Sequence, residues 1–394
     1  MNAMAWKKTF YAILAAEFLA IAGFGTSTPI IPLFLQDLGV TEPSALNMWV
    51  GAVNFAAAFA LAFMAPIWGR LADSYGRKSM LLRSMAGGGL VIFLIGFAQT
   101  PLQFLFLRVF QGAVTGTVAA ANVLVASVVP EKEVGLRLGL LQMGIALGNS
   151  LGPLMGGHMA DAIGHRFTFF VTSLLLVLAA AIVRFWVVES FVPRRPKRFT
   201  VKSLVPDIKP LFESRVILTL VILAGLVQMG IAFVIPILPL YVQEIAGGYR
   251  VASTTGLILG VSALASALAS ALTSRIASRL GSVRLLVISF LLAGAFHVPQ
   301  AFAWSPDALL VSRVLTAIML GMAIPLINIL LAQNTEKTRQ GSIYGLAASM
   351  NAVGMAAGPM ISAVVAIAAG YKAVFLCAAL ILGGAAWLAR KTLR

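Results

Sequence analysis

Long apolar stretches separated by short polar breaks run the whole length of this chain of 394 residues. A helix needs about 20 mostly apolar residues to cross the roughly 30 Å of hydrocarbon in a bilayer. Stretches of that length predict twelve membrane-spanning helices, near residues 9–36, 44–70, 79–99, 102–128, 135–160, 167–188, 216–243, 252–277, 283–303, 307–333, 340–368 and 371–390.

The composition indicates that lipid is the solvent of these helices. Hydrophobic residues make up 60% of the chain and charged residues 11%, whereas a soluble domain carries about 25% charged residues. In water, so few charges could not cover so much apolar surface. We therefore expect an all-α membrane protein.

Basic residues gather in every second polar break. Of the 29 Lys and Arg residues, 23 lie in one set of breaks and three in the other. Such an excess marks the cytoplasmic side of a membrane protein. The bias predicts a multi-pass protein of the bacterial inner membrane with both termini in the cytoplasm. It also explains the net charge of +16 without a nucleic-acid partner.

The two halves of the chain repeat each other. Five landmarks recur at offsets of 205 to 207 residues: Pro29 and Pro236, Arg70 and Arg275, Arg108 and Arg313, Glu131 and Glu336, and Gly152 and Gly358. We expect a six-helix bundle over residues 1–188, a basic cytoplasmic linker over 189–215 and a second six-helix bundle over 216–394. The linker suits anionic lipid headgroups, or alternatively a specific partner.

The loop after the second predicted helix runs from Gly69 to Lys78 and contains Asp73, Gly76 and Arg77. It resembles the signature loop of the major facilitator superfamily, in which Gly, Asp, Gly and a basic pair recur at this spacing. Gly76 permits a tight turn, and Asp73 can pair with Arg77 or receive the amides of a helix N-terminus. The resemblance implies that this Asp latches the halves together on the cytoplasmic side. The alternative is a basic loop that only sets topology.

The fifth predicted helix carries a glycine every fourth residue. Such spacing gives a smooth face for close helix packing in lipid, and a proline within it favours a kink. The run resembles the antiporter signature of the same superfamily, which implies export, whereas ordinary small-residue packing would explain the glycines alone. Its residues are Gly144, Gly148, Gly152, Pro153, Gly156 and Gly157.

Glu17 is the only carboxylate well inside an apolar stretch. Arg108 and Gln111, in the fourth predicted helix, resemble an intramembrane element of the superfamily, and charged groups inside a membrane are usually functional. By depth, Arg108 can reach Glu17 if the two helices are neighbours. The hypothesis is that Glu17 carries the coupled proton; the alternative is a structural carboxyl that snorkels or stays paired with Arg108. Asn54, Gln228 and Arg313 are further candidates for a polar cavity.

Other chemistry has no support in the sequence. The run Gly76-Arg77-Lys78-Ser79 lacks the G-x-x-x-x-G-K-[ST] spacing of a phosphate-binding loop. His158, His165 and His297 have no metal-ligand spacing, and no catalytic constellation is present. We therefore expect no enzyme, no metal and no cofactor, with a proton gradient as the driving force.

Together these motifs identify a resemblance to the twelve-helix drug:proton antiporters of the major facilitator superfamily, and within them to MdtG-like multidrug exporters. The resemblance implies alternating-access export of amphipathic or cationic drugs, bound at the midplane between the halves, and we expect a monomer. Glu17 departs from the pattern of these relatives, so its proposed role rests on its depth alone. The alternatives are a transporter of one metabolite, such as a sugar, peptide or lipid, and a non-transporting membrane sensor.

Overall fold

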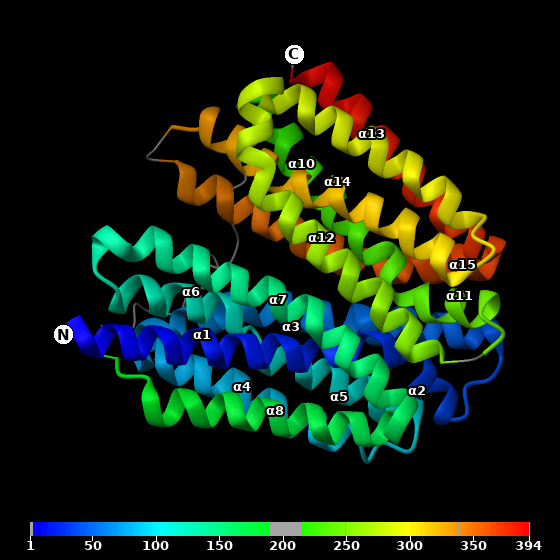
Figure 1. Ribbon diagram of the computed structural model, residues 1–394, viewed down its shortest axis with the longest axis horizontal. Coiled ribbons are helices and arrows are strands. Elements are labelled where there is room, and N and C mark those ends of the chain that lie inside the picture. The colour runs from blue at the N-terminus through cyan, green and yellow to red at the C-terminus, as the bar shows by residue number, and fades with distance from the viewer. Residues whose placement is uncertain (1–2, 190–213, 249, 337–338, 394) are drawn as a thin grey trace.

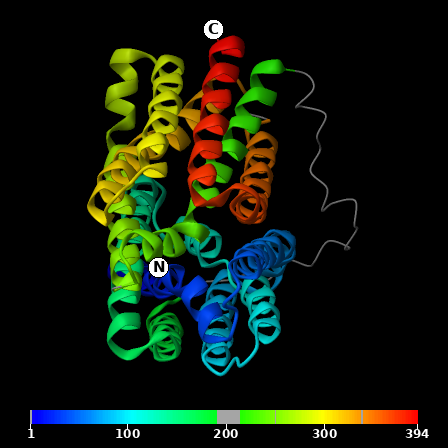
Figure 2. The same cartoon turned by 90° about the vertical axis from the view of Figure 1, so that its right-hand side faces the viewer.

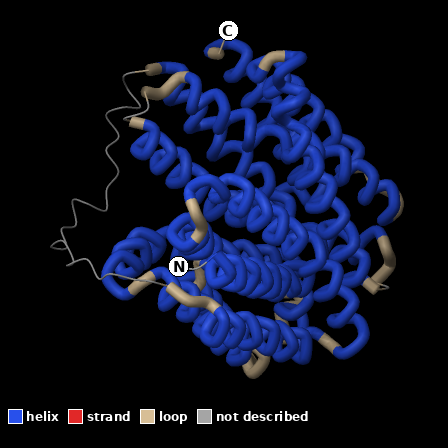
Figure 3. Tube along the Cα trace, turned by 60° about the vertical axis from the view of Figure 1, so that its left-hand side comes forward, coloured by secondary structure: helices blue, strands red, loops and turns tan. Residues whose placement is uncertain are grey.

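The structure is a computed structural model that describes residues 3–189, 214–248, 250–336 and 339–393. The side chains of residues 3–5 and of Asp73 lie outside the described part, as does most of the predicted linker. Figure 3 shows that the described chain consists of helices joined by short loops. They are α1 (Ala3–Thr26), η1 (Thr28–Ile30), α2 (Ile31–Asp37), α3 (Pro43–Tyr75), α4 (Arg77–Ile95), α5 (Pro101–Val114), α6 (Thr117–Val128), α7 (Glu131–Ile163), α8 (His165–Trp186), α10 (Arg215–Val234), η3 (Ile235–Ile237), α11 (Leu238–Ile245), α12 (Val251–Leu280), α13 (Ser282–Ala301), α14 (Pro306–Gln333) and α15 (Gln340–Thr392).

The described part of the chain contains the twelve helical segments of membrane-spanning length that the sequence predicted. Within the described residues, 11 helical segments are long and apolar enough to span a bilayer. The last of them, α15, has 53 residues and contains Gly370 in a non-helical conformation, with φ 78° and ψ 173°. It is therefore two helices joined at a sharp turn, which raises the count from eleven to twelve.

Three of the predicted helices are not continuous: two are interrupted at prolines and one at a glycine. The first predicted helix is divided into α1, η1 and α2 around Pro29 and Pro32, and the α10–η3–α11 segment is divided likewise around Pro236 and Pro239. Proline removes a backbone donor and so interrupts the helical hydrogen bonds. The fourth predicted helix, 102–128, is broken into α5 and α6 at Thr115 and Gly116.

The helices form two bundles, α1–α8 and α10–α15, which lie one above the other in Figure 1. The bundles converge at the end where α2 and α11 lie and diverge toward the end that carries the N-terminus. We call that second end the terminal side. Figure 2 views the molecule from the converging end. Across the interface, α7 packs along α12 and α3 packs along α15.

The bundles are sealed against each other at the converging end. The Gln36 side chain on α2 donates to the Gln243 side chain on α11 at 3.0 Å. These residues are 207 positions apart, the offset of the internal repeat, so the bond joins equivalent positions of the two halves. Close by in the interface, Asn47 on α3 donates to the Tyr371 hydroxyl on α15 at 3.4 Å.

Four glycines make one-residue corners between consecutive helices. Gly76, Gly164, Gly281 and Gly370 have φ values of 87°, 87°, 82° and 78°. This left-handed region favours glycine because it has no Cβ. Counting the spans from the N-terminus in groups of three, each corner joins the second and third span of one group. The described chain therefore contains four such three-helix groups.

Polar caps and apolar surfaces complete the helices. Glu42 is the N-cap residue of α3. Hydrogen bonds from the Ser44 hydroxyl and the Ala45 amide hold the pKa of its carboxyl below the usual range. Large apolar side chains remain exposed on the outer helix faces, as expected where lipid replaces water. Examples are Phe63, Phe185, Leu268, Leu380 and Trp387.

Candidate functional site

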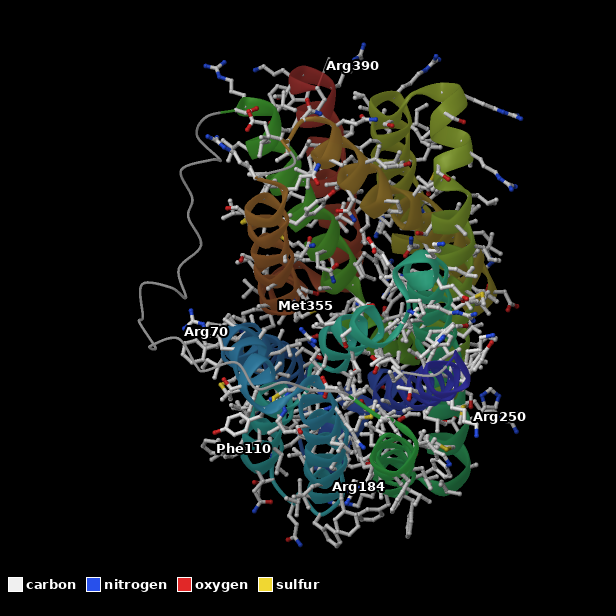
Figure 4. All side chains as sticks on the ribbon, turned by 90° about the vertical axis from the view of Figure 1, so that its left-hand side faces the viewer. Arg70, Phe110, Arg184, Arg250, Met355 and Arg390 are labelled. Atoms are coloured by element: carbon white, nitrogen blue, oxygen red, sulfur yellow. The ribbon has the colours of Figure 1, made fainter. Side chains whose placement is uncertain are left out.

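A cavity of about 840 Å³ lies between the two bundles. It extends from the break between α5 and α6 to the corner between α3 and α4, where Gly69, Ala72 and Arg77 belong to its wall. That corner is on the terminal side, whereas the opposite end is closed by the bond between Gln36 and Gln243. Figure 4 looks at the terminal side and shows Arg70 and Met355 on opposite edges of the space between the bundles. The structure is thus open to the terminal side.

Both bundles contribute to the cavity wall. The N-terminal bundle provides most of it, including the predicted residues Asn54, Arg108 and Gln111, and the C-terminal bundle adds the predicted Gln228. The remaining C-terminal contributors are apolar: Ile231, Ala232, Ile235, Pro236, Met355 and Pro359.

Two predicted cavity residues lie elsewhere. Arg313 is only 6% exposed and is buried inside the C-terminal bundle, away from the lining. Glu17 is fully buried and also lies outside the lining. The equivalence of Arg108 and Arg313 in the repeat therefore does not extend to their surroundings.

Arg108 is held by neutral partners. Its Nη1 donates to the Gln111 side chain at 2.7 Å and its Nη2 donates to the Asn54 side chain at 3.3 Å. Nε has no hydrogen-bond partner within the described part of the chain. No carboxylate among the described residues therefore pairs with this guanidinium beside the cavity.

Glu17 bonds to a different residue from the one that its depth suggested. The Thr117 hydroxyl donates to Glu17 Oε1 at 2.8 Å, and Oε2 has no partner among the described residues. No ion pair with Arg108 forms in this part of the molecule, so the permanent-pair alternative does not describe this state. Depth along a helix fixes height in the membrane but not the direction in which a side chain points.

The predicted gating loop forms a corner with a reciprocal clasp. The Glu189 carboxylate accepts the backbone N–H groups of Arg77 and Lys78, at 3.0 and 2.9 Å, at the start of α4. Lys78 Nζ in turn donates to the carbonyls of Arg184 and Val187, at the end of α8. Negative charge at a helix start and positive charge at a helix end both complement the helix dipole. The sequence had suggested Asp73 as an acceptor of such amides; its side chain lies outside the described residues.

The glycine run of α7 lies at a junction of three helices. On one face, an added Cβ at Gly148, Gly152 or Gly156 would meet the backbone of α1. On the other, Gly157 lies against the Ala252 carbonyl of α12, and the Pro153 carbonyl lies against Gly256. In the second half, Gly354 of α15 lies against Gly225 of α10 in the same way. The run therefore packs α7 against α1 of its own bundle on one face and against α12 of the partner bundle on the other.

Sequence reasoning missed four residues at the site. Trp68 and Arg83 line the cavity, Thr117 bonds Glu17, and Glu189 forms the clasp. A glycine in mid-span, Gly116, was the available signal for the broken helix. The first acid after the sixth apolar stretch was the available signal for Glu189. No sequence pattern pointed to Trp68 or Arg83.

Residues 13–252 and 220–394 match the sequence profile of the Major Facilitator Superfamily. The chain belongs to this family. It is therefore a membrane transporter of the superfamily and not an enzyme.

The curated relatives have a consistent name. The chain is 34% identical over 372 residues to the multidrug resistance protein MdtG of Salmonella paratyphi B, covering 94% of this chain and 91% of the relative. The MdtG of Salmonella typhimurium matches with the same identity and coverage.

Solved structures support the fold. A mutant of the nucleoside transporter NupG superposes with a TM-score of 0.84 at 14% identity, covering 98% of this chain and 100% of that one. A bacterial homologue of the lysosomal transporter Spinster, in an inward-facing unoccupied conformation, gives 0.80 at 14% identity, over 100% and 98% of the two chains. Both show the major facilitator fold of this chain.

Proposed function

We propose that the protein exports amphipathic small molecules from the bacterial cytoplasm by alternating access, in exchange for protons. The observation that carries the proposal is the cavity of about 840 Å³, lined from both bundles and open on one side of the membrane only. The bias of 23 basic residues to three supports placing its open, terminal side in the cytoplasm. The MdtG relatives and the glycine run of α7 support export of drugs.

The charge of the cavity supports a preference among substrates. Arg77, Arg83 and Arg108 belong to the wall, and no described Asp or Glu side chain does. The family resemblance implied amphipathic or cationic drugs, and an anion at the midplane would attract cations, but Glu17 is buried outside the wall. The lining favours amphipathic anions over cations because a carboxylate, sulfonate or phosphate group can pair with a guanidinium.

A resistance and accumulation panel in an efflux-deficient host tests this function. The panel pairs amphipathic anions with cations of matched size and is run with and without a protonophore. We expect lower accumulation of several amphipathic anions, restored by the protonophore. A growth effect confined to one compound would instead indicate a transporter of a specific metabolite, and unchanged accumulation of all compounds would contradict export.

Glu17→Gln tests the proton coupling. The amide keeps the shape of the side chain but cannot bind and release a proton, so the protonophore-sensitive part of efflux should fall to the level of the empty host. Expression and membrane insertion, checked by immunoblot of the membrane fraction, should stay normal. Undiminished proton-driven efflux in this variant would exclude Glu17 as the coupling group.

A further inference from the structure

The break between α5 and α6 exposes backbone groups in the middle of a membrane span. Thr115 is extended, Gly116 has φ 115°, and α6 begins at Thr117. Irregular backbone at membrane depth is tolerated where it lines a cavity, and all three residues belong to the cavity wall. The first amides of a helix have no acceptors inside it and carry the positive end of the helix dipole. Because α6 begins in the cavity wall, this positive end lies at the cavity.

Thr117 stands between this cavity and Glu17. Its hydroxyl donates the one hydrogen bond that Glu17 receives within the described residues, at 2.8 Å. Thr117 is 3% exposed and belongs to the cavity wall, whereas Glu17 is 0% exposed and does not. The second carboxylate oxygen, Oε2, is buried without a partner. A hydroxyl both donates and accepts, so Thr117 is a polar connection from the cavity to the carboxyl group.

Other charged groups lie away from this carboxyl. The helices packed against α1 are α6, α7 and α8, and α6 has no titratable residue. Arg108, on the neighbouring α5, is bonded to Gln111 and Asn54. The titratable groups of α7 and α8 sit toward the helix ends: Glu131, Lys132, Glu133, Arg137, His158, Asp161, His165, Arg166 and Arg184.

We propose that Thr117 is a positioning residue for proton coupling, which holds the Glu17 carboxyl at the start of α6 and passes the proton between it and the cavity. This inference rests on the proposed function. For loading, a hydronium ion in the cavity gives a proton to Thr117 Oγ1 while the Oγ1–H proton moves to Glu17 Oε1. The products are water, an intact hydroxyl and a neutral carboxylic acid, and release follows the reverse path.

Gly116 places Thr117 for this task. In an uninterrupted helix, the amide of Thr117 would bond to the carbonyl four residues before it. The extended Thr115 and the left-handed Gly116 together end α5 and let α6 begin at Thr117 beside the cavity. A carboxylate is stabilised at such a helix start, and that stabilisation ends when the group takes up a proton.

Infrared titration of the purified full-length protein tests the role of Thr117. The C=O stretching band of protonated Glu17 is identified as the band that Glu17→Gln removes, and its amplitude is followed against pH. Thr117→Val keeps the shape but removes the hydroxyl, while Thr117→Ser keeps the hydroxyl as a matched control. Thr117→Ala is a second hydroxyl-free variant in case Val impairs folding, which gel filtration reports.

The expected result is a shift of the titration midpoint to higher pH. A hydrogen bond to a charged group changes an equilibrium about tenfold or more, so Val and Ala should move the midpoint by about one pH unit or more. Ser should match the wild type. An unchanged midpoint in both hydroxyl-free variants would overturn the proposal, and so would the absence of any titrating band that Glu17→Gln removes.

The failure of the proposed function would look different. Proton-driven efflux that survives in Glu17→Gln would exclude coupling through Glu17, even if Thr117→Val still moved the midpoint. Conversely, Glu17→Gln could lose proton coupling while the hydroxyl-free variants leave the midpoint unmoved. Glu17 would then remain the coupling group, and only the role of Thr117 would be excluded.

Discussion

At the scale of single residues, the cavity wall holds a guanidinium in a fixed orientation. The Arg83 guanidinium lies 3.5 Å from the centre of the Trp68 ring, and the Trp68 indole N–H donates to the Ala113 carbonyl at 2.6 Å. Arg83 Nε and Nη1 have no partners in the described part of the chain. A cation over an aromatic face is attracted by the ring. The stacking therefore holds the Arg83 guanidinium in the cavity wall with two buried donors that have no partner among the described residues.

Replacing Arg83 with Met should weaken transport of an amphipathic anion. The loss of a charge-assisted hydrogen bond corresponds to a change of about tenfold or more in kcat/KM. Uptake of a fluorescent amphipathic sulfonate into inverted membrane vesicles measures this change. Arg83→Lys, which keeps the charge but not the planar stacking, should fall between Met and wild type. Equal rates for Arg83→Met and wild type would contradict a role in anion binding.

At the scale of helices, the sequence predicted the spans well and their interruptions poorly. Length and hydropathy identify a span, but a single glycine such as Gly116 is compatible with both a straight and a broken helix. The depth of a residue in its span also does not reveal how the helix is rotated about its axis. For this reason Glu17 was expected near Arg108, whereas its side chain bonds to Thr117. Partners from distant segments, such as Glu189 at the start of α4, depend on tertiary packing.

The glycine run of α7 offers a test at this scale. An added Cβ at Gly156 would collide with the backbone of Thr26 on α1, whereas at Gly139, on the same helix, nothing lies within 4 Å. Overpacking a tight contact costs about 1–3 kcal/mol, so Gly156→Ala should lower the thermal unfolding midpoint in detergent. Gly139→Ala should not lower it. Equal midpoints for the two variants would contradict the close packing of α1 on α7.

At the scale of the whole molecule, the internal repeat in the sequence is also a repeat of contacts. In the first half α7 packs on α1 of its own bundle and on α12 of the other, and in the second half α15 packs on α10 and on α3. The sequence predicted this duplication because prolines, glycines and charges mark equivalent points. It could not predict which side is open, since one sequence supports every state of the transport cycle.

Crosslinking the converging end should arrest transport. In a Cys377→Ala background, Gln36→Cys and Gln243→Cys place thiols at positions whose side chains now meet at 3.0 Å. A short bismaleimide should then abolish efflux, because the bundles could no longer separate there. Each single-cysteine variant treated with the same reagent is the control. Continued efflux after complete crosslinking, measured by gel shift, would contradict opening at this end.

The four glycine corners determine which parts of the protein can move independently. Gly76, Gly164, Gly281 and Gly370 each leave a single residue between two long helices, so the adjoining ends of each pair must stay together during any movement. The remaining spans are α1–α2, α5–α6, α10–α11 and α14, and the first three of these are the interrupted ones. Local bending during transport should concentrate in the three interrupted spans, because their helical hydrogen bonds are already broken. Two of them hold Glu17 and Thr117, so a change in protonation would occur where the backbone yields most easily.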